Sequence, residues 1–233
     1  MKKVLLFSML VFATGLLFSC SSDDRQDGGF PVIAGLLSYE GQTYKTVKID
    51  TLPWWMAENL NYNPDSGTSA CYDNEPSNCN TYGRLYNWST AMDLPSSCDS
   101  TSCSNQIQSK HQGICPPGWH IPNYNDLNVL MNYVGGSSTA GKHLKARSGW
   151  NSPSDIENLD TYGFSALPGG FGGSGGRFAG VGTYGFWWST GEYENSSDSN
   201  GSAYYRNMYY YHDSASWHYG YKTYLLSVRC LQD

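Results

Sequence analysis

Residues 115–123 read CPPGWHIPN and join a loop to a helix. The prolines and Gly118 close a stretch rich in Ser, Pro and Cys, and Ile121-Pro122-Asn123 sets up a helix start. Beyond it, apolar residues recur with the spacing of an amphipathic helix, at Leu127, Leu130, Met131 and Val134. Gly135-Gly136 then predicts where this helix ends.

Outward from this helix, the chain divides into a mixed first half and a strand-rich second half. Two further helices are expected, from Tyr82 to Met92 and around Ala140 to Ala146. The alternating segment from Gln42 to Ile49 predicts a strand that Pro53 breaks, and an apolar piece follows from Trp54 to Leu60. After Trp150, a glycine-rich loop is expected over 168–176, with strands at Phe164–Leu167, Arg177–Val181, Tyr184–Ser189, Ala203–Tyr211 and Tyr224–Cys230. Two to three short helices and a strand-rich C-terminal half predict an α+β fold.

The first 20 residues resemble the leader of a bacterial lipoprotein. Lys2 and Lys3 give a positive end, and residues 4–18 form an almost continuous apolar run. This run is shorter than the roughly 20 apolar residues that span a bilayer. The sequence LFSC at residues 17–20 is similar to a lipobox, which implies cleavage after residue 19 and lipid on Cys20. A plain signal peptide with an incidental cysteine is the alternative.

The leader divides the chain into three parts. Residues 1–19 are the expected signal peptide, residues 20–36 a lipidated flexible tether, and residues 37–233 a single folded domain. The tether is expected because SSDDRQDGG at 21–29 cannot bury apolar surface. Ser and Asp directly after Cys20 also resemble the surface-export signal of Bacteroidetes lipoproteins, although an ordinary solvated linker has the same composition. The expected location is the outer membrane, on the cell surface.

Six cysteines remain once lipid occupies Cys20, and an even number in an exported chain predicts disulfides. Cys71 with Cys79, and Cys98 with Cys103, are close enough in sequence to close local loops. Cys115 and Cys230 would then join the middle of the domain to its last strand. Zinc is the alternative, but the chain contains no C-x-x-C spacing.

Composition and motifs give no indication of catalysis. The formal net charge of −6 offers no electrostatic reason to bind nucleic acid. Residues 170–176 match both a dinucleotide fingerprint and a nucleophile elbow, but the strand-like segment that follows is not the helix both motifs require. None of the five histidines lies in an H-E-x-x-H motif. Glu192, Glu194 and Asp198 are carboxylates without a recognisable spacing. The sequence therefore predicts no enzyme, no cofactor and no metal site.

Nine tyrosines lie between Glu192 and Tyr224, among Ser, Asn, Asp, His and Gly. Tyr offers large amphipathic contact area and the small polar residues offer adaptable hydrogen bonds, as in binding loops. Packing within a sheet is the alternative, yet successive tyrosines on a strand must face both sides. Trp217 and Tyr219 share a face if that stretch is extended. The expected ligand-binding residues are Tyr193, Tyr204, Tyr209, Tyr210, Tyr211, His212, Trp217, Tyr219 and Tyr221.

Four blocks of sequence resemble one family in the same order. They are Tyr44–Ile49 with Trp54–Leu60, Tyr82–Trp88, Cys115–Pro122 and Ser227–Cys230. Together they resemble the Fibrobacter succinogenes major paralogous domain, over roughly Leu37 to Asp233. The resemblance implies a C-type-lectin-like fold in an exported protein of Bacteroidetes or Fibrobacteres, but it implies little about biochemical role. The Glu-Pro-Asn and Trp-Asn-Asp motifs of calcium-dependent lectins are absent, and Glu75-Pro76-Ser77 lies in the wrong part of the chain.

The function expected from these features is a surface-anchored binding or adhesion module for a glycan or protein ligand. Some lectin-fold proteins are variable targets of diversity-generating retroelements, which scatter Asn codons to Tyr, His, Asp, Ser, Ala and Gly. Residues 209–216 and 218–221 have that composition. The alternatives are a structural surface protein without a specific ligand and, third, a cell-surface enzyme.

Overall fold

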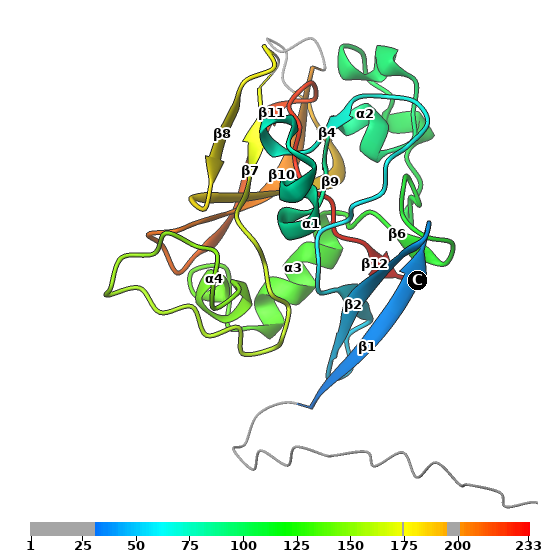
Figure 1. Ribbon diagram of the computed structural model, residues 1–233. Helices are drawn as coiled ribbons and strands as arrows, with labels where there is room; N and C mark the ends of the chain where they lie inside the picture. Colours follow the sequence, from blue (N-terminus) through cyan, green and yellow to red (C-terminus); the bar gives the residue numbers. More distant parts are fainter. Residues whose placement is uncertain (1–30, 174, 195–200) are drawn as a thin grey trace, which may run out of the picture.

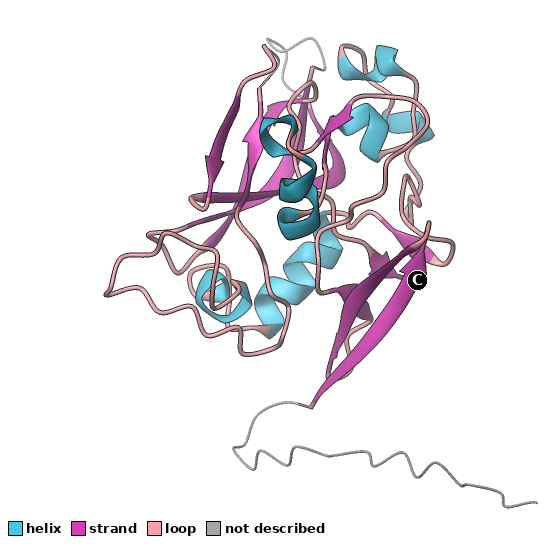
Figure 2. Cartoon of the chain, viewed as in Figure 1, coloured by secondary structure: helices cyan, strands magenta, loops and turns pink. Residues whose placement is uncertain are grey.

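The computed structural model describes residues 31–173, 175–194 and 201–233. The leader, Cys20 and most of the predicted tether lie outside these residues. The described chain is a mixed structure in which short helices and several small sheets are linked by long loops (Figures 1 and 2). The mixed fold that the sequence predicts is therefore confirmed.

The largest sheet joins the two ends of the described chain, in the order β1-β2-β3-β12-β6. β2 (Gln42–Ile49) has the predicted bounds and β3 (Trp54–Met56) follows the break at Pro53. β12 (Leu231–Gln232) lies between β3 and β6 (Trp119–His120), since Leu231 pairs with both Trp55 and His120. In Figure 1 the C-terminus accordingly lies beside the hairpin of the first two strands.

β1 (Val32–Tyr39) was not predicted and corrects the tether boundary. It pairs along its whole length with β2, from Val32 opposite Ile49 to Tyr39 opposite Gln42. The connecting residues Glu40 and Gly41 have φ of 47° and 73°, the backbone of a tight two-residue hairpin. Within the described residues, regular structure thus begins at Val32 rather than Leu37, because VIAGLLSY pairs with β2 along its whole length.

A second sheet holds the tyrosine-rich region, in the order β11-β10-β9. β9 (Tyr184–Tyr193) and β10 (Ser202–Tyr209) were both expected, with shorter or shifted bounds. β11 (Ala215–Tyr221) was not predicted as a separate strand. Its pairing with β10 places Tyr204 opposite Tyr219 and Arg206 opposite Trp217.

Two of the three predicted helices are confirmed. α3 (Tyr124–Tyr133) begins at a capping box in which the Asn123 side chain accepts from the backbone of Asp126 and the Asp126 carboxylate accepts from the backbone of Asn123. α4 (Ala140–Leu144) follows after the Gly135-Gly136 turn.

The predicted helix from Tyr82 to Met92 is wrong. α1 (Pro76–Tyr82) ends at Tyr82, where the predicted helix was expected to begin. α2 (Trp88–Ala91) begins only after β5 (Leu85–Tyr86). The reason is Gly83, which has φ of 77° and lies against the backbone of Asn59 and Leu60, where a Cβ would be 2.8–2.9 Å from their carbonyl oxygens. This close approach breaks the helical pattern into two pieces.

Three other segments differ from their expected structure. Residues 164–167 form only an isolated bridge, Lys145 to Ala166, and the segment 224–230 is held by single bridges instead of a regular strand. The expected glycine-rich loop contains β7 (Gly169–Gly172), which pairs with β8 (Phe178–Val181). A short strand pair also joins β4 (Ser69–Ala70) to β5. Single turns of 3-10 helix lie at Tyr72–Asn74, Ser96–Asp99 and Ser104–Gln106.

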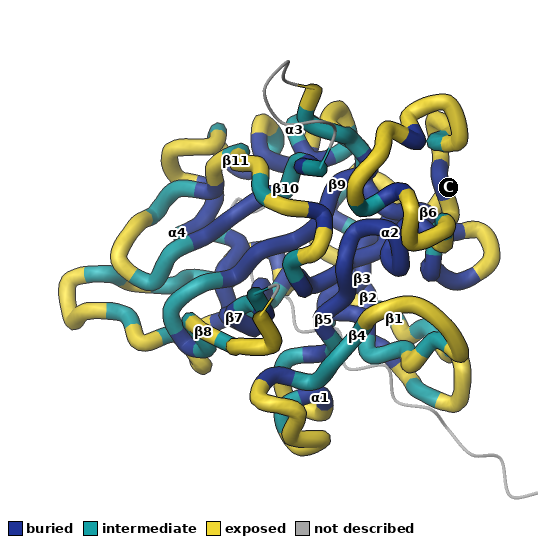
Figure 3. Tube along the Cα trace, turned by 90° about the horizontal axis from the view of Figure 1, so that it is seen from above, coloured by how far each residue is buried: buried dark blue, intermediate teal, exposed yellow. Residues whose placement is uncertain are grey.

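The three predicted disulfides are confirmed: Cys71–Cys79, Cys98–Cys103 and Cys115–Cys230. The first two close loops of 8 and 5 residues, whereas the third joins positions 115 residues apart. Cys115 and Cys230 are fully buried in the larger core cluster. Figure 3 shows this buried interior surrounded by exposed loops.

One buried polar cluster joins the early and late parts of the chain. The Arg229 guanidinium donates to the Asn59 side-chain oxygen (2.9 Å), to Ser165 O (2.6 Å) and to Phe164 O. The same Asn59 oxygen accepts from the indole of Trp187 at 2.8 Å. Burial lowers the pKa of Arg229 to about 9, against the opposing effect of the Asp160 and Glu58 carboxylates, so the guanidinium stays charged at neutral pH.

Candidate ligand-binding surfaces

The β9–β11 sheet sorts the predicted tyrosines onto two faces. In β10, Tyr205 points into the larger core, with its ring centroid 5.3 Å from that of Phe186. Its neighbour Tyr204 points the other way, with its centroid 5.5 Å from Tyr193 and 6.1 Å from Trp217. This is the alternation that side chains on a strand must follow. One tyrosine of each adjacent pair is thereby kept out of that core.

On the Tyr204 face, five rings follow one another in what we call the aromatic row: Tyr124, Trp217, Tyr204, Tyr193 and Tyr219. Their successive centroids are 4.8, 6.1, 5.5 and 3.7 Å apart. The end residues Tyr124 and Tyr219 expose 55% and 44% of their surface, and the three between them are half-buried. The row is thus a continuous strip of rings with accessible ends.

Trp217 is held in place by contacts with Arg206 and Asn128. The Arg206 guanidinium, itself 2% exposed, lies 4.3 Å from the centroid of the Trp217 ring. The Asn128 side-chain oxygen accepts from both, at 2.8 Å from Arg206 and 2.9 Å from the Trp217 indole. Burial lowers the pKa of Arg206 to about 10, still well above neutrality. Trp217 is therefore a positioned ring, and it supports α3 as well as the row.

The other predicted binding residues lie elsewhere. Tyr209, Tyr210, Tyr211 and His212 gather at the turn between β10 and β11, where Tyr211 is 44% exposed and its ring lies 4.3 Å from His212. Tyr209 also packs against the larger core. Tyr221, at the end of β11, is 55% exposed and contacts Tyr224. The nine residues thus form a row, a turn cluster and one separate position.

Sequence reasoning missed Tyr124. It is the first residue of α3 and lies off the apolar face that faces the core. An exposed aromatic residue beside a helix cap was the signal present in the sequence, but its neighbour Trp217 is 93 positions away. Only the fold brings them into contact.

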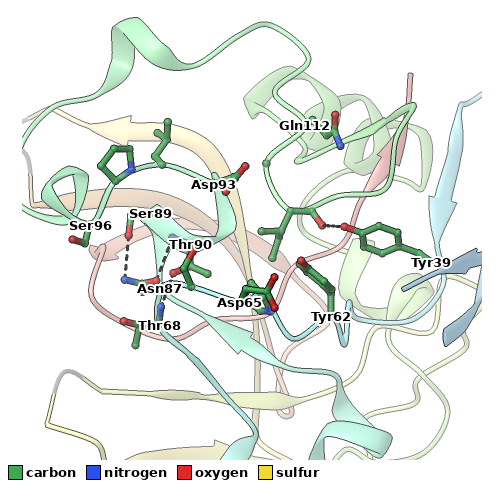
Figure 4. A pocket seen from close by; sticks show the side chains of 17 residues that line it. Tyr39, Tyr62, Asp65, Thr68, Asn87, Ser89, Thr90, Asp93, Ser96 and Gln112 are labelled. Atoms are coloured by element: carbon green, nitrogen blue, oxygen red, sulfur yellow. Dashed lines mark hydrogen bonds between the residues drawn. The ribbon is translucent and has the colours of Figure 1, made fainter. Parts of the chain in front are cut away.

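A second feature is a hollow that we call the polar cleft, with a volume of about 560 Å³ (Figure 4). Four separate segments form it: the end of β1, residues 62–68, the residues around α2, and residues 112–114. The Tyr39 and Tyr62 rings lie 5.3 Å apart on one side, and the Tyr39 hydroxyl donates to Ile114 O at 3.3 Å. The side chains labelled in Figure 4 are Tyr39, Tyr62, Asp65, Thr68, Asn87, Ser89, Thr90, Asp93, Ser96 and Gln112.

Hydrogen bonds hold the floor of the polar cleft. The Asn87 amide donates to Asp99 at 2.6 Å, and the Ser89 hydroxyl donates to the same carboxylate at 2.9 Å. Thr90 accepts from the backbone N–H of Thr68 at 2.7 Å. Burial raises the pKa of Asp99, although the hydrogen bonds from Ser89 and Asn87 favour the ionised form and act in the opposite direction. The floor is therefore a satisfied polar network, as buried polar groups require.

The polar cleft is acidic. Its lining includes Asp65 and Asp93, both exposed, and contains no Lys, Arg or His. Burial raises the pKa of Tyr39 to about 12, with further contributions from Tyr62, Glu40 and Asp93. The pKa of Tyr62 is raised by burial and by Glu40, Asp65 and Asp93. Both phenols thus lie within the field of several carboxylates.

Glu192 is not available to a ligand. Its carboxylate accepts from Lys222 Nζ at 2.8 Å, from the Ser102 hydroxyl at 2.6 Å and from the Cys103 N–H at 2.8 Å. Asp198 lies outside the described residues. Among residues 31–173, 175–194 and 201–233, no group of three His, Cys, Asp or Glu side chains is arranged to hold a metal.

A disulfide-bonded mixed domain with aromatic and polar surfaces is the class of protein that these features define. A family model describes the chain from residue 47 to residue 232 as a Fibrobacter succinogenes major domain. The chain belongs to this family. No curated protein and no solved structure matches it. In the described part of the chain, no helix has the length and apolar character needed to cross a bilayer.

Proposed function

We propose that this protein is a lipid-anchored binding module on the outer surface of the outer membrane, with a C-type-lectin-like fold. Its ligand is a glycan that lies along the aromatic row. The observation that carries this proposal is the continuity of the five rings, from Tyr124 at the start of α3 to Tyr219 on β11. Family membership and the mixed, disulfide-bonded fold support the choice of fold.

The chemistry of the aromatic row favours a sugar over a charged partner. Tyr and Trp combine a flat apolar ring with a polar edge, and sugar rings combine apolar C–H faces with hydroxyls. Arg206, the cation that lies against Trp217 in the row, is buried and already bonded to Asn128. An elongated, uncharged ligand fits such a strip better than a charged protein surface does.

We expect Tyr124→Ala and Tyr219→Ala each to reduce glycan affinity at least tenfold, since truncating an aromatic anchor often costs about 2 kcal/mol or more. A glycan array on the full-length protein in detergent identifies the ligand, and calorimetry measures each variant. Stability should fall by only about 1 kcal/mol, because each side chain is substantially exposed and loses one stacked ring contact.

Two comparison variants complete this test. Val129→Ala alters an exposed apolar residue of α3 outside the row and is expected to bind normally. Tyr211→Ala matches Tyr219→Ala in residue type and in its exposure of 44%. Loss of binding in Tyr211→Ala alone would move the site to the turn cluster, and capture of a protein with no glycan binding would refute the sugar assignment.

The position of the tyrosine-rich residues supports a second proposed role, as a ligand surface diversified by a retroelement. Residues 209–216 and 218–221 occupy the β10–β11 turn and the edge strand β11, where several exposed side chains can change without altering the core. This placement is what a retroelement-diversified ligand surface needs. A reverse-transcriptase gene beside the coding sequence, with a near-repeat of the segment, would support that role.

Anchoring is tested at Cys20. Cys20→Ser removes the sulfur that would carry lipid, and we expect the product to leave the detergent phase or to remain uncleaved. A matched Ser21→Ala variant keeps the cysteine and should stay with the membrane. A Cys20→Ser product that is cleaved as before and still associates with the membrane would contradict the lipoprotein assignment.

A further inference from the structure

We propose that the polar cleft is a second binding site, for a small organic cation: an ammonium group carried on a polar body of about the size of an amino sugar. The site is separate from the aromatic row, because none of the five row residues lines the cleft. The inference rests on the shape, the charge and the aromatic content of the cleft.

Shape comes first. A volume of about 560 Å³ lies within the range of about 300–1,000 Å³ that small-ligand pockets occupy. Its walls come from four segments that are fixed to one another. The Tyr39 hydroxyl donates to Ile114 O, the Ile114 N–H donates to Ala91 O at 3.1 Å, and the Thr68 N–H donates to Thr90. The hollow is therefore built into the fold, and it does not depend on one loop.

Charge then selects the ligand class. The cleft presents the carboxylates of Asp65 and Asp93, with Glu40 near both phenols, and no basic side chain in its lining offsets them. A concave surface lined by one sign of charge concentrates ions of the opposite sign. An anionic ligand would be repelled, and a neutral one would gain nothing from these carboxylates as charges.

The aromatic content favours an ammonium group over a bare metal ion. The Tyr39 and Tyr62 rings lie 5.3 Å apart and tilted by 48°, and both phenols lie within the field of the Asp93 carboxylate. Ammonium groups bind favourably to aromatic faces within about 6 Å of the ring centroid. The hydroxyl and amide groups of Thr68, Ser96 and Gln112 line the remaining wall and suit a hydroxyl-bearing body.

The decisive probes are two disaccharides that differ in the acetylation of their amino groups, which removes the positive charges. Glucosamine disaccharide carries two ammonium groups below neutral pH, and its di-N-acetylated counterpart carries none. Calorimetry on the full-length protein in detergent, at low salt and slightly acidic pH, should show binding of the first and at least tenfold weaker binding of the second. Molar salt should weaken the first, because exposed charges are screened.

Isosteric variants locate the charge. Asp65→Asn and Asp93→Asn are each expected to weaken binding about two- to fivefold, as exposed ion pairs do, and the double variant should lose more. Asn is also well suited to the positive φ of 52° at position 93. Asp155→Asn, an exposed carboxylate outside the cleft, is the control and should bind as the unaltered protein does.

Several outcomes would overturn the proposal. Equal or tighter binding of the acetylated disaccharide that persists in Tyr124→Ala and Tyr219→Ala would make the cleft a neutral sugar site. Unchanged binding in the Asp65→Asn/Asp93→Asn double variant would place the ligand elsewhere. Calcium that binds alone and is lost in the double variant would make it a metal site. The two sites remain distinguishable, because binding at the aromatic row is lost in Tyr124→Ala and Tyr219→Ala, and neither residue lines the cleft.

Discussion

Replacing both Cys115 and Cys230 with alanine is expected to lower the free energy of unfolding by about 4–5 kcal/mol. The disulfide joins positions 115 residues apart, and both cysteines are fully buried. Its loss frees a long loop in the unfolded chain, and in the chain-entropy account the gain in entropy grows with loop length. Urea unfolding of the oxidised variant and of the unaltered protein, followed by tryptophan fluorescence, measures the difference.

Cys98→Ala/Cys103→Ala is the matched control, because it removes a buried disulfide whose cysteines are only 5 residues apart. The same entropy account predicts a loss of less than about 3 kcal/mol there. The comparison isolates loop length, since both double variants remove two buried sulfur atoms. Equal losses in the two variants would show that local packing, and not loop length, sets the contribution of Cys115–Cys230.

Local patterns in the sequence were sufficient for several elements. The strand from Gln42 to Ile49 and the helix after Asn123 depend on periodicity and on a cap, which are properties of adjacent residues. The disulfide pairing followed from the spacing of the cysteines, in a chain that its leader predicts to be exported. In each case the deciding feature is a periodic pattern, a helix cap or a cysteine spacing. Such features are visible in the sequence even when the packing partners are unknown.

Elements that depend on distant partners were not predictable in this way. β1 is a strand because β2 lies beside it, and the helix expected from Tyr82 to Met92 is broken because Gly83 meets the backbone of Asn59. The aromatic row needs Tyr124 beside Trp217. The polar cleft needs four segments at once, so no motif in the sequence points to it.

The blocks that place the chain in its family explain why the resemblance carries so little function. Asn59 belongs to the block Trp54–Leu60 and Arg229 to the block Ser227–Cys230, and their side chains are hydrogen-bonded in the core. Cys115 from another block is bonded to Cys230, and Tyr86 O accepts from Trp188 at 2.7 Å. These residues hold the fold together. The candidate binding surfaces lie mostly outside these blocks.

Lys222→Met is expected to lower the free energy of unfolding by about 3–5 kcal/mol, since it leaves a buried carboxylate without its cation. The Lys222 and Glu192 side chains are 0% and 2% exposed and 2.8 Å apart. The same ammonium donates to Cys98 O at 2.9 Å and to Thr101 O at 3.1 Å, so it ties the Cys98–Cys103 loop to the end of β11. Urea unfolding at neutral pH measures the loss.

Two companion variants separate the buried pair from a general effect of removing a lysine. Lys110→Met changes an exposed lysine and should stay within about 0.5 kcal/mol of the unaltered protein. The double variant Lys222→Met/Glu192→Gln should be more stable than Lys222→Met, because no unpaired charge remains buried. A double variant as unstable as the single one would mean that Lys222 acts through its carbonyl contacts and not through Glu192.

Acid should reduce the contribution of Glu192 in a defined direction. Burial alone would raise the pKa of Glu192, but the bonds from Lys222, Ser102 and Cys103 outweigh it and hold that pKa below its ordinary value. A carboxyl with a depressed folded-state pKa stabilises the fold above its unfolded pKa of about 4.3 and loses that stabilisation as the pH falls through the folded value. The stability difference between the unaltered protein and Glu192→Gln should therefore shrink as the pH is lowered below about 4.3. A difference that stays constant from neutral to acidic pH would show that the carboxylate charge contributes nothing to the fold.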